Sequence, residues 1–214
     1  SPIAEGELAG VSAMTATLLG KGSATIDKDS FNEEVDFMGA TINFGSQSAS
    51  ASSLSRYFGR VLELMAEAAL HPNFTQEEFD KEKDILLDGI KSGEKSVTTA
   101  ARRVENLLAY GKDHPYGEYV SKESVERVKL ADVDAFYKRY FLPNNAYLVI
   151  VGDVDAGDLK KQVKKLFGKW KKKNLSTDPI PDVTNVSTTQ IDFVNMPNAV
   201  QTEVTVQNTV SLRK

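Results

Sequence analysis

The chain has 214 residues, of which 41% are hydrophobic and 26% are charged, and its formal net charge is −4 at pH 7. These proportions are those of an ordinary globular protein, and the slight acidity gives no indication of nucleic-acid binding. The sequence has no cysteine, which excludes disulfides and thiolate metal ligands. No apolar run approaches the ~20 residues that a membrane-spanning helix needs.

The first part of the sequence predicts helices interrupted by two short strands. Apolar residues at helical spacing predict a helix over residues 7–19, and Ser30 with Glu33 has the capping-box spacing that opens a second helix. Short strands are expected at residues 41–44 and 48–54. Later helices are expected at residues 55–70, 76–91, 122–128 and 131–141.

The stretch 140–170 predicts the structural centre of the chain. Residues 146–151 are apolar and rich in β-branched side chains, which is typical of a strand buried on both faces. Gly152 ends this strand, and Asp155 or Gly157 begins a helix. The apolar side chains of that helix fall on one face: Leu159, Val163, Leu166, Phe167 and Trp170.

The composition changes after this helix. We interpret residues 1–173 as one domain and residues 174–187, which contain two prolines and several serines and threonines, as a linker. Residues 188–214 have strand character at 191–194 and 200–210, and the second of these runs alternates apolar and polar side chains.

Four short motifs together carry a resemblance to a known family. They are Gly-Ala-Thr-Ile-Asn at residues 39–43, His-Pro-Tyr-Gly at 114–117, Phe-Leu-Pro-Asn-Asn-Ala at 141–146 and Val-Ile-Val-Gly-Asp-Val at 149–154. In this order and spacing, the sequence resembles the family of pitrilysin, insulin-degrading enzyme and mitochondrial processing peptidase. Members of that family are zinc metallopeptidases, together with related subunits that have lost their metal.

The predicted fold is α+β, a two-layer sandwich in which helices cover one face of a largely antiparallel sheet. The resemblance implies that residues 1–173 form the peptidase-family domain without the strands that usually open it. Residues 188–214 would either begin a truncated second domain or complete the first sheet by joining residues 147–151. They could join it within the chain or by exchange with a second copy, which would give a homodimer of this fragment.

The resemblance also indicates where a zinc centre would lie. The family carries H-x-x-E-H on its first helix, and its third ligand follows seven residues after a glutamate on a later helix. We aligned the chain on Gly10, Leu18, Lys21 and Gly22 and took Glu82 as the glutamate. The motif positions then fall on Ala13, Ala16, Thr17 and Gly89. None of these residues is a usable ligand or base, so we expect no metal in this chain and zinc only in a catalytic partner.

Other candidate sites favour structural interpretations. His71 and His114 each precede a proline in a predicted loop, and we expect them to be exposed or hydrogen-bonded there rather than zinc ligands. Asp153, Asp155 and Asp158 lack the rest of a calcium loop and are interpreted as helix-capping residues. Eight lysines between residues 160 and 173 are interpreted as a solvated face, with an anionic surface or a membrane as the alternative contact.

The predicted function is that of a non-catalytic subunit, inactive alone, that helps a zinc-bearing homologue to enclose extended peptides. Asn43, Phe44, Gly45 and Ser46 are the predicted peptide-binding residues, because active members of the family pair peptides with a strand edge. The alternative for residues 48–54 is a thin edge strand or loop without function.

Two other functions stay open at this stage. The first is a structural scaffold protein with no role in proteolysis, and the second is an active zinc peptidase with ligands at other positions. The resemblance favours a bacterial periplasm or envelope as the location. No nucleic-acid partner is expected.

Overall fold

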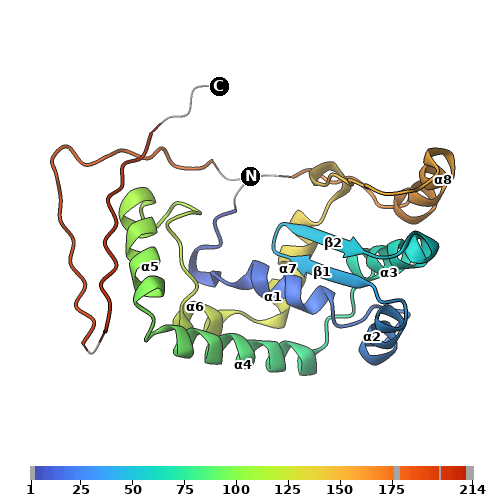
Figure 1. Cartoon of the computed structure of the whole chain (residues 1–214), viewed down its shortest axis with the longest axis horizontal. Helices are drawn as coiled ribbons and strands as arrows, with labels where there is room; N and C mark the ends of the chain where they lie inside the picture. The colour runs from blue at the N-terminus through green and yellow to red at the C-terminus, as the bar shows by residue number, and fades with distance from the viewer. Residues whose placement is uncertain (1–2, 176–178, 198, 211–214) are drawn as a thin grey trace. The chain divides into compact units, whose positions relative to one another are not determined.

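The structure of the protein, a computed structural model, describes residues 3–175, 179–197 and 199–210 (Figure 1). Its helices are α1 (Val11–Leu19), α2 (Lys28–Phe37), α3 (Phe58–Leu70), α4 (Gln76–Gly93), α5 (Val97–Tyr110), α6 (Lys122–Arg127), α7 (Leu130–Tyr140) and α8 (Ala156–Phe167). Its strands are β1 (Thr41–Gly45) and β2 (Ser48–Ser52), and short 3-10 turns lie at Gly6–Leu8, Ser55–Tyr57 and Pro143–Asn145. None of the described helices is long and apolar enough to cross a membrane.

The chain divides into two compact units, which we describe separately. The hairpin unit comprises Val11–Lys83 and Lys129–Leu175. The α5 unit comprises residues 3–10, residues 84–128 and the described residues beyond 178.

The hairpin unit is built around one apolar cluster. Side chains from α2, the chain after it and α3 form this cluster, and apolar side chains of β1 pack against it. Its buried members are Phe31, Val35, Met38, Ala40, Val61, Leu64 and Ala68. Within the same unit α1 packs along α7, β1 lies beside α1, and β2 lies beside α3. The helices predicted over the first 70 residues are confirmed, and two of them, α2 and α3, supply most of this cluster.

One predicted helix start was wrong. The N-cap of α2 is Asp27, whose side chain accepts a hydrogen bond from the Ser30 backbone N–H at 2.9 Å. Ser30 lies in the first turn and donates its hydroxyl to the same carboxylate at 2.7 Å. Aspartate and serine are both good N-caps. In the structure the earlier residue, Asp27, takes this role. The first predicted helix, 7–19, is likewise shorter in the structure, since Gly6–Leu8 is a separate 3-10 turn.

The two predicted strands near residue 45 are confirmed as an antiparallel hairpin. The register pairs Ile42 with Ala51 and Phe44 with Ala49, so these four side chains share the face that is turned toward the core. The opposite face carries Thr41, Asn43, Gly45, Ser48, Ser50 and Ser52.

The α5 unit is held together by polar contacts around residues 118–124. The Glu118 carboxylate accepts from the backbone N–H groups of Glu5 and Gly6, at 2.9 and 2.8 Å. The buried Ser124 hydroxyl donates to the Ala9 carbonyl at 2.7 Å. In contrast α5 is amphipathic but contains no buried residue.

The predicted central strand at residues 146–151 was wrong. This segment is neither helix nor strand, and Tyr147, Val149 and Val151 are 99%, 80% and 93% exposed. An apolar β-rich pattern shows that side chains favour burial, but a strand also needs a neighbour for its backbone N–H and C=O groups. In the described parts of the chain no strand supplies that neighbour.

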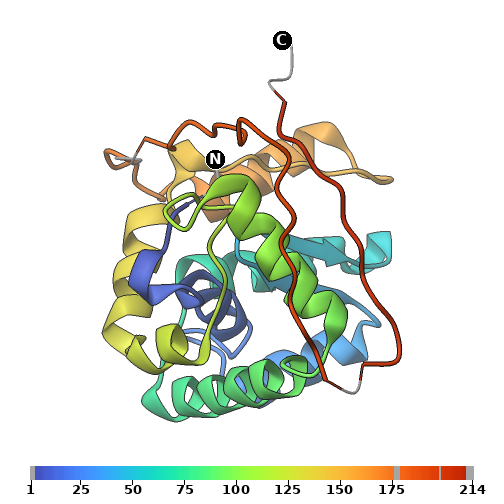
Figure 2. The same ribbon diagram turned by 90° about the vertical axis from the view of Figure 1, so that its left-hand side faces the viewer.

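The predicted strands at residues 191–194 and 200–210 were also wrong for their described residues, and they do not join a sheet. They run as extended, mostly exposed chain (Figure 2). The Asn185 side chain bridges two such runs by accepting from the Thr209 backbone N–H at 3.0 Å and donating to the Thr209 carbonyl at 2.6 Å. Residues 198 and 211–214 of the predicted tail, with residues 1–2 and 176–178, lie outside the described residues.

The helix predicted after this segment is confirmed as α8. Asp155 is its N-cap and accepts from the Asp158 backbone N–H at 2.8 Å, so the capping interpretation is confirmed for Asp155. Its apolar residues are half-buried, and α8 packs against α3.

The fold is therefore α+β, as predicted, with mostly helical structure and one two-stranded antiparallel sheet in the described residues. The two-layer sandwich is not confirmed. The domain boundary at 173/174 and the linker at 174–187 stay predictions.

A matched pair of substitutions tests the corrected position of residues 146–151. Val61→Ala removes two methyl groups from a side chain that is 3% exposed, and we expect it to lower the free energy of unfolding by about 2 kcal/mol. Val149→Ala makes the same chemical change at an exposed side chain and should cost at most about 0.5 kcal/mol. Urea unfolding measures both. Equal losses would mean that Val149 is buried in a sheet after all.

Candidate functional site

The predicted zinc-motif positions lie on a regular helix. Ala13 and Thr17 are exposed on α1, one helical turn apart, and the Thr17 hydroxyl donates to the Ala13 carbonyl at 3.1 Å. Ala16 is buried, with 4% of its surface exposed. Ala13 and Ala16 each carry only a methyl group, and the Thr17 hydroxyl is already hydrogen-bonded to the backbone of its own helix.

The glutamate used to locate the third ligand position forms an ion pair. Lys21 Nζ lies 2.6 Å from Glu82 Oε1, and the two side chains are 23% and 12% exposed. This pair joins the chain just after α1 to α4 within the hairpin unit. Gly89 lies on the same helix as Glu82, about two turns later and so on the same helix face. A Cβ at Gly89 would meet no atom within 4 Å.

The residues at these positions do not fit a zinc ion. Zinc needs imidazole, thiolate or carboxylate ligands, and a hydrolase adds a base for the bound water. Ala13, Ala16, Thr17 and Gly89 supply none of these groups. In the part of the chain that the structure describes, no three His, Asp or Glu side chains lie close enough together to hold a metal ion.

The two histidines take the structural roles that the sequence predicted. His71 is exposed at the end of α3. His114 is buried, its ring stacks on Tyr110 at 5.0 Å between centroids, and its Nδ1 accepts from the Tyr116 backbone N–H at 3.0 Å.

The hairpin lies at the end of α1, beside the residues that we aligned with H-x-x-E-H. Gly20 follows Thr17 by three residues, and Ala13, Thr17 and Gly20 fall on one side at helical spacing. A Cβ at Gly20 would lie 3.8 Å from the Phe44 ring, which places β1 next to this side of α1. The residues aligned with H-x-x-E-H and the predicted peptide-binding hairpin are thus neighbours within one unit.

The four predicted peptide-binding residues do not share one face. Asn43 and Gly45 belong to the outward face of β1, and Ser46 is exposed in the turn. Phe44 is half-buried and packs against the apolar cluster. An outward face of threonine, asparagine, glycine and serines is polar and small, and every residue of β2 is exposed.

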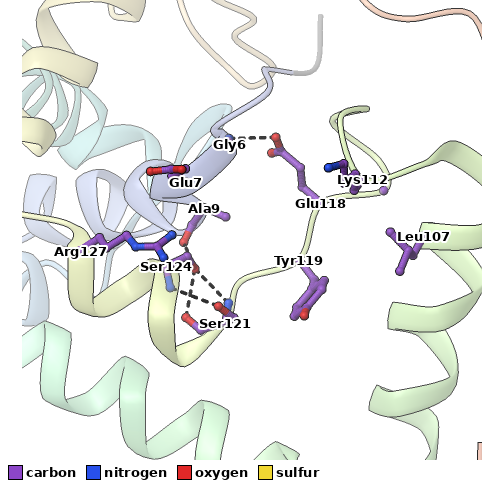
Figure 3. Close-up of a pocket in the computed structure, with 11 residues that line it drawn as sticks. Gly6, Glu7, Ala9, Leu107, Lys112, Glu118, Tyr119, Ser121, Ser124 and Arg127 are labelled. Atoms are coloured by element: carbon purple, nitrogen blue, oxygen red, sulfur yellow. Dashed lines mark hydrogen bonds between the residues drawn. The ribbon is translucent and has the colours of Figure 1, made fainter.

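A shallow pocket lies elsewhere, within the α5 unit (Figure 3). Glu7, Glu118, Lys112 and Arg127 are among its lining residues, so its charges are mixed. Glu118 and Ser124 are engaged in the backbone hydrogen bonds that hold this unit together. None of the predicted site residues lines it, and we assign it no function.

The positions that we aligned with H-x-x-E-H thus carry alanine, alanine and threonine on a regular helix, and this helix lies beside a small polar hairpin. The chain belongs to peptidase family M16, the insulinase family, whose model matches residues 2–119. A second model, described as the peptidase M16 inactive domain, matches residues 127–209. The family predicted from the sequence motifs is confirmed.

The chain is also similar to individual zinc proteases and processing peptidases. The chain is 28% identical over 175 residues to the chloroplastic stromal processing peptidase of Arabidopsis thaliana, covering 77% of this chain and 13% of that protein. It is 23% identical over 177 residues to the uncharacterized zinc protease YmxG of Bacillus subtilis, covering 80% and 43%. The fold is similar to a peptidase M16 inactive domain from Pseudomonas fluorescens, with a TM-score of 0.71, 23% identity and coverage of 85% and 47%. The chain thus spans less than half the length of these relatives.

A designed metal site tests the geometry of α1. The chain itself, purified without chelator, should contain no stoichiometric zinc. The variant Ala13→His/Thr17→His places two imidazoles one turn apart on an exposed face, so it should bind Ni²⁺ or Zn²⁺. At metal concentrations about 100-fold above Kd, binding should stabilise the variant by about 2.7 kcal/mol in thermal unfolding.

The single variant Thr17→His is the control and should show a much smaller shift. An unchanged melting temperature of the double variant with metal would mean that α1 is not an exposed regular helix. One equivalent of zinc in the unmodified chain, lost on His71→Ala or His114→Ala, would contradict the account of the emptied site.

Proposed function

We propose that this chain is part of a non-catalytic M16 subunit that, with a zinc-bearing homologue, encloses and binds extended peptides. The observation that carries the proposal is the state of α1. The helix packs against α7, and the chain just after it forms an ion pair with α4, while Ala13, Ala16 and Thr17 supply none of the groups that zinc chemistry requires.

Peptide hydrolysis by a zinc enzyme needs a metal that polarises the carbonyl and activates water, and a base that takes the proton. An alanine in the glutamate position can neither accept nor donate a proton. The chemistry must therefore be supplied by another subunit, and the role left to this chain is to bind and position.

The hairpin supplies a suitable surface for an extended peptide. In the described residues β1 and β2 pair only with each other, so the outer edge of each strand has backbone groups free of strand pairing. An extended peptide can satisfy such an edge by β-augmentation. The small side chains of β2 leave that backbone accessible, since Ser48, Ser50 and Ser52 alternate with Ala49 and Ala51. Peptide affinity would come from main-chain bonds and would depend little on peptide sequence.

Catalysis by the pair is the first expected outcome. The full-length protein alone should not hydrolyse a fluorogenic peptide, and adding a zinc-bearing M16 partner from the same source should raise the rate well above that of the partner alone. Metal removal from the partner should abolish the activity. Replacing Ala51 by proline, which removes a β2 backbone donor that points away from β1 in this register, should lower the rate of the pair.

The matched control is Ser55→Pro, at the start of a 3-10 turn outside the strands. Chelator-sensitive hydrolysis by the isolated protein would contradict the proposal, and so would a pair that is no more active than the partner alone.

Peptide binding through main-chain bonds gives a second expected outcome. A bound peptide that is N-methylated one residue at a time should lose affinity with a period of two along its sequence, because alternate amides face the strand. Each effective methyl group should cost about 1–2 kcal/mol, the cost of a lost hydrogen bond together with a clash. Calorimetry measures this series. A loss without the two-residue period would mean that the peptide binds through its side chains.

A further inference from the structure

The lysines between residues 160 and 173 are separated from the acidic remainder of the chain. This segment of 14 residues contains eight lysines and no aspartate or glutamate, a charge of +8. The rest of the chain then has 18 basic and 30 acidic residues, a charge of −12. A segment of this charge density repels itself and attracts anions. We define these eight side chains as the lysine surface: Lys160, Lys161, Lys164, Lys165, Lys169, Lys171, Lys172 and Lys173.

The structure turns the lysine surface toward solvent. All eight residues are exposed, whereas the opposite face of α8 is half-buried and packs against α3 (Figure 1). The Gln162 side chain fixes this orientation by donating to the Gly59 carbonyl of α3 at 2.8 Å. The helix therefore cannot bury its lysines without breaking its contact with α3.

The lysines that follow α8 are held next to the same unit. Asn144 Nδ2 donates to the Lys173 carbonyl at 3.1 Å, and the Lys173 backbone N–H donates to Asn144 Oδ1 at 3.4 Å. This pair of bonds joins the segment after α7 to the segment after α8. The last of the eight lysines is thereby held within the same unit as α8.

Few of these charges are neutralised within the chain. Lys161 lies 2.9 Å from Asp158, and Lys165 lies 3.9 Å from Glu63. Such exposed pairs contribute little stability. The other six lysines have no carboxylate within 4 Å among the described residues, so their charges are available to an external anion.

We propose that the lysine surface docks the protein on an anionic phospholipid membrane. Clusters of four to eight basic residues on an amphipathic helix are attracted to acidic headgroups, each lysine contributing a roughly fivefold gain in affinity. All eight residues are lysine and none is arginine, which suits diffuse attraction to a charged plane better than geometric recognition of one phosphate. A nucleic acid would favour arginine and exposed aromatic rings, and Trp170 is half-buried. The docking is electrostatic, with the apolar face of α8 kept on α3.

Vesicle co-sedimentation tests this proposal independently of any role in proteolysis. The chain should bind phosphatidylcholine vesicles that contain phosphatidylglycerol, should not bind vesicles of phosphatidylcholine alone, and should dissociate at high salt. Lys160→Gln/Lys164→Gln/Lys172→Gln should weaken binding about a hundredfold, because three such contributions are lost. Replacing the same three lysines by arginine should preserve it.

The matched control removes the same charge elsewhere. Lys91→Gln/Lys95→Gln/Lys112→Gln changes three exposed lysines that have no carboxylate partner among the described residues, and it should leave vesicle binding almost unchanged. Trp170 is the single tryptophan, and its emission should not shift on binding. Equal loss in both triple variants, a blue shift that reports insertion of α8, or binding of polyglutamate or DNA without binding of the vesicles would each overturn the proposal.

Discussion

The ion pair between Lys21 and Glu82 is the constraint on which the candidate site depends. It joins the end of α1 to α4 at 2.6 Å, with both side chains largely withdrawn from water. A partly buried charge without its partner is costly, so each residue fixes the other. Because Lys21 follows Thr17 by about one helical turn, the pair fixes the chain next to the positions that we aligned with H-x-x-E-H. The position of the hairpin, whose Phe44 lies over Gly20, follows from the same arrangement.

The proposed loss of catalysis is compatible with an intact α1, because metal binding and core packing involve different side chains. The residues of α1 that pack in the interior are apolar or small, namely Val11, Met14, Thr15, Ala16, Leu18 and Leu19. Ala13 and Thr17 are exposed, and ligand side chains there would contribute to metal binding rather than to the core. Replacing them removes the chemistry at little cost in stability, and a domain altered in this way can still bind peptides, partners or surfaces.

The helices could be predicted from the sequence because each buries an apolar face that recurs at helical spacing, as α3 does with Val61, Leu64 and Ala68. Helix ends were less certain, since Asp27 and Ser30 are both competent caps. The pattern of residues 146–151 predicted a strand that the structure does not contain, because a strand is defined by its partner and a segment's own pattern contains no information about one. The hairpin could be predicted because its two strands are adjacent in sequence.

The site was predictable only through the resemblance to the family. An alanine or a threonine on a helix has no chemical signal of its own, and Ala13, Ala16 and Thr17 became informative when they were aligned with H-x-x-E-H. The alignment anchors themselves, Lys21 and Glu82, proved to be bonded to each other, although no local pattern links two residues so far apart in sequence. The lysine cluster was visible in the sequence, but the exposure of the α8 lysines depends on the packing of α8 on α3.

We infer that this chain belongs to a subunit whose catalytic zinc lies in another protein. Purification of the full-length protein from its source organism, followed by mass spectrometry of what accompanies it, tests that claim most directly. We expect a second M16 protein that carries an intact H-x-x-E-H motif, in about equal amount and with bound zinc. A protein that purifies alone, contains its own zinc and cleaves peptides would contradict it.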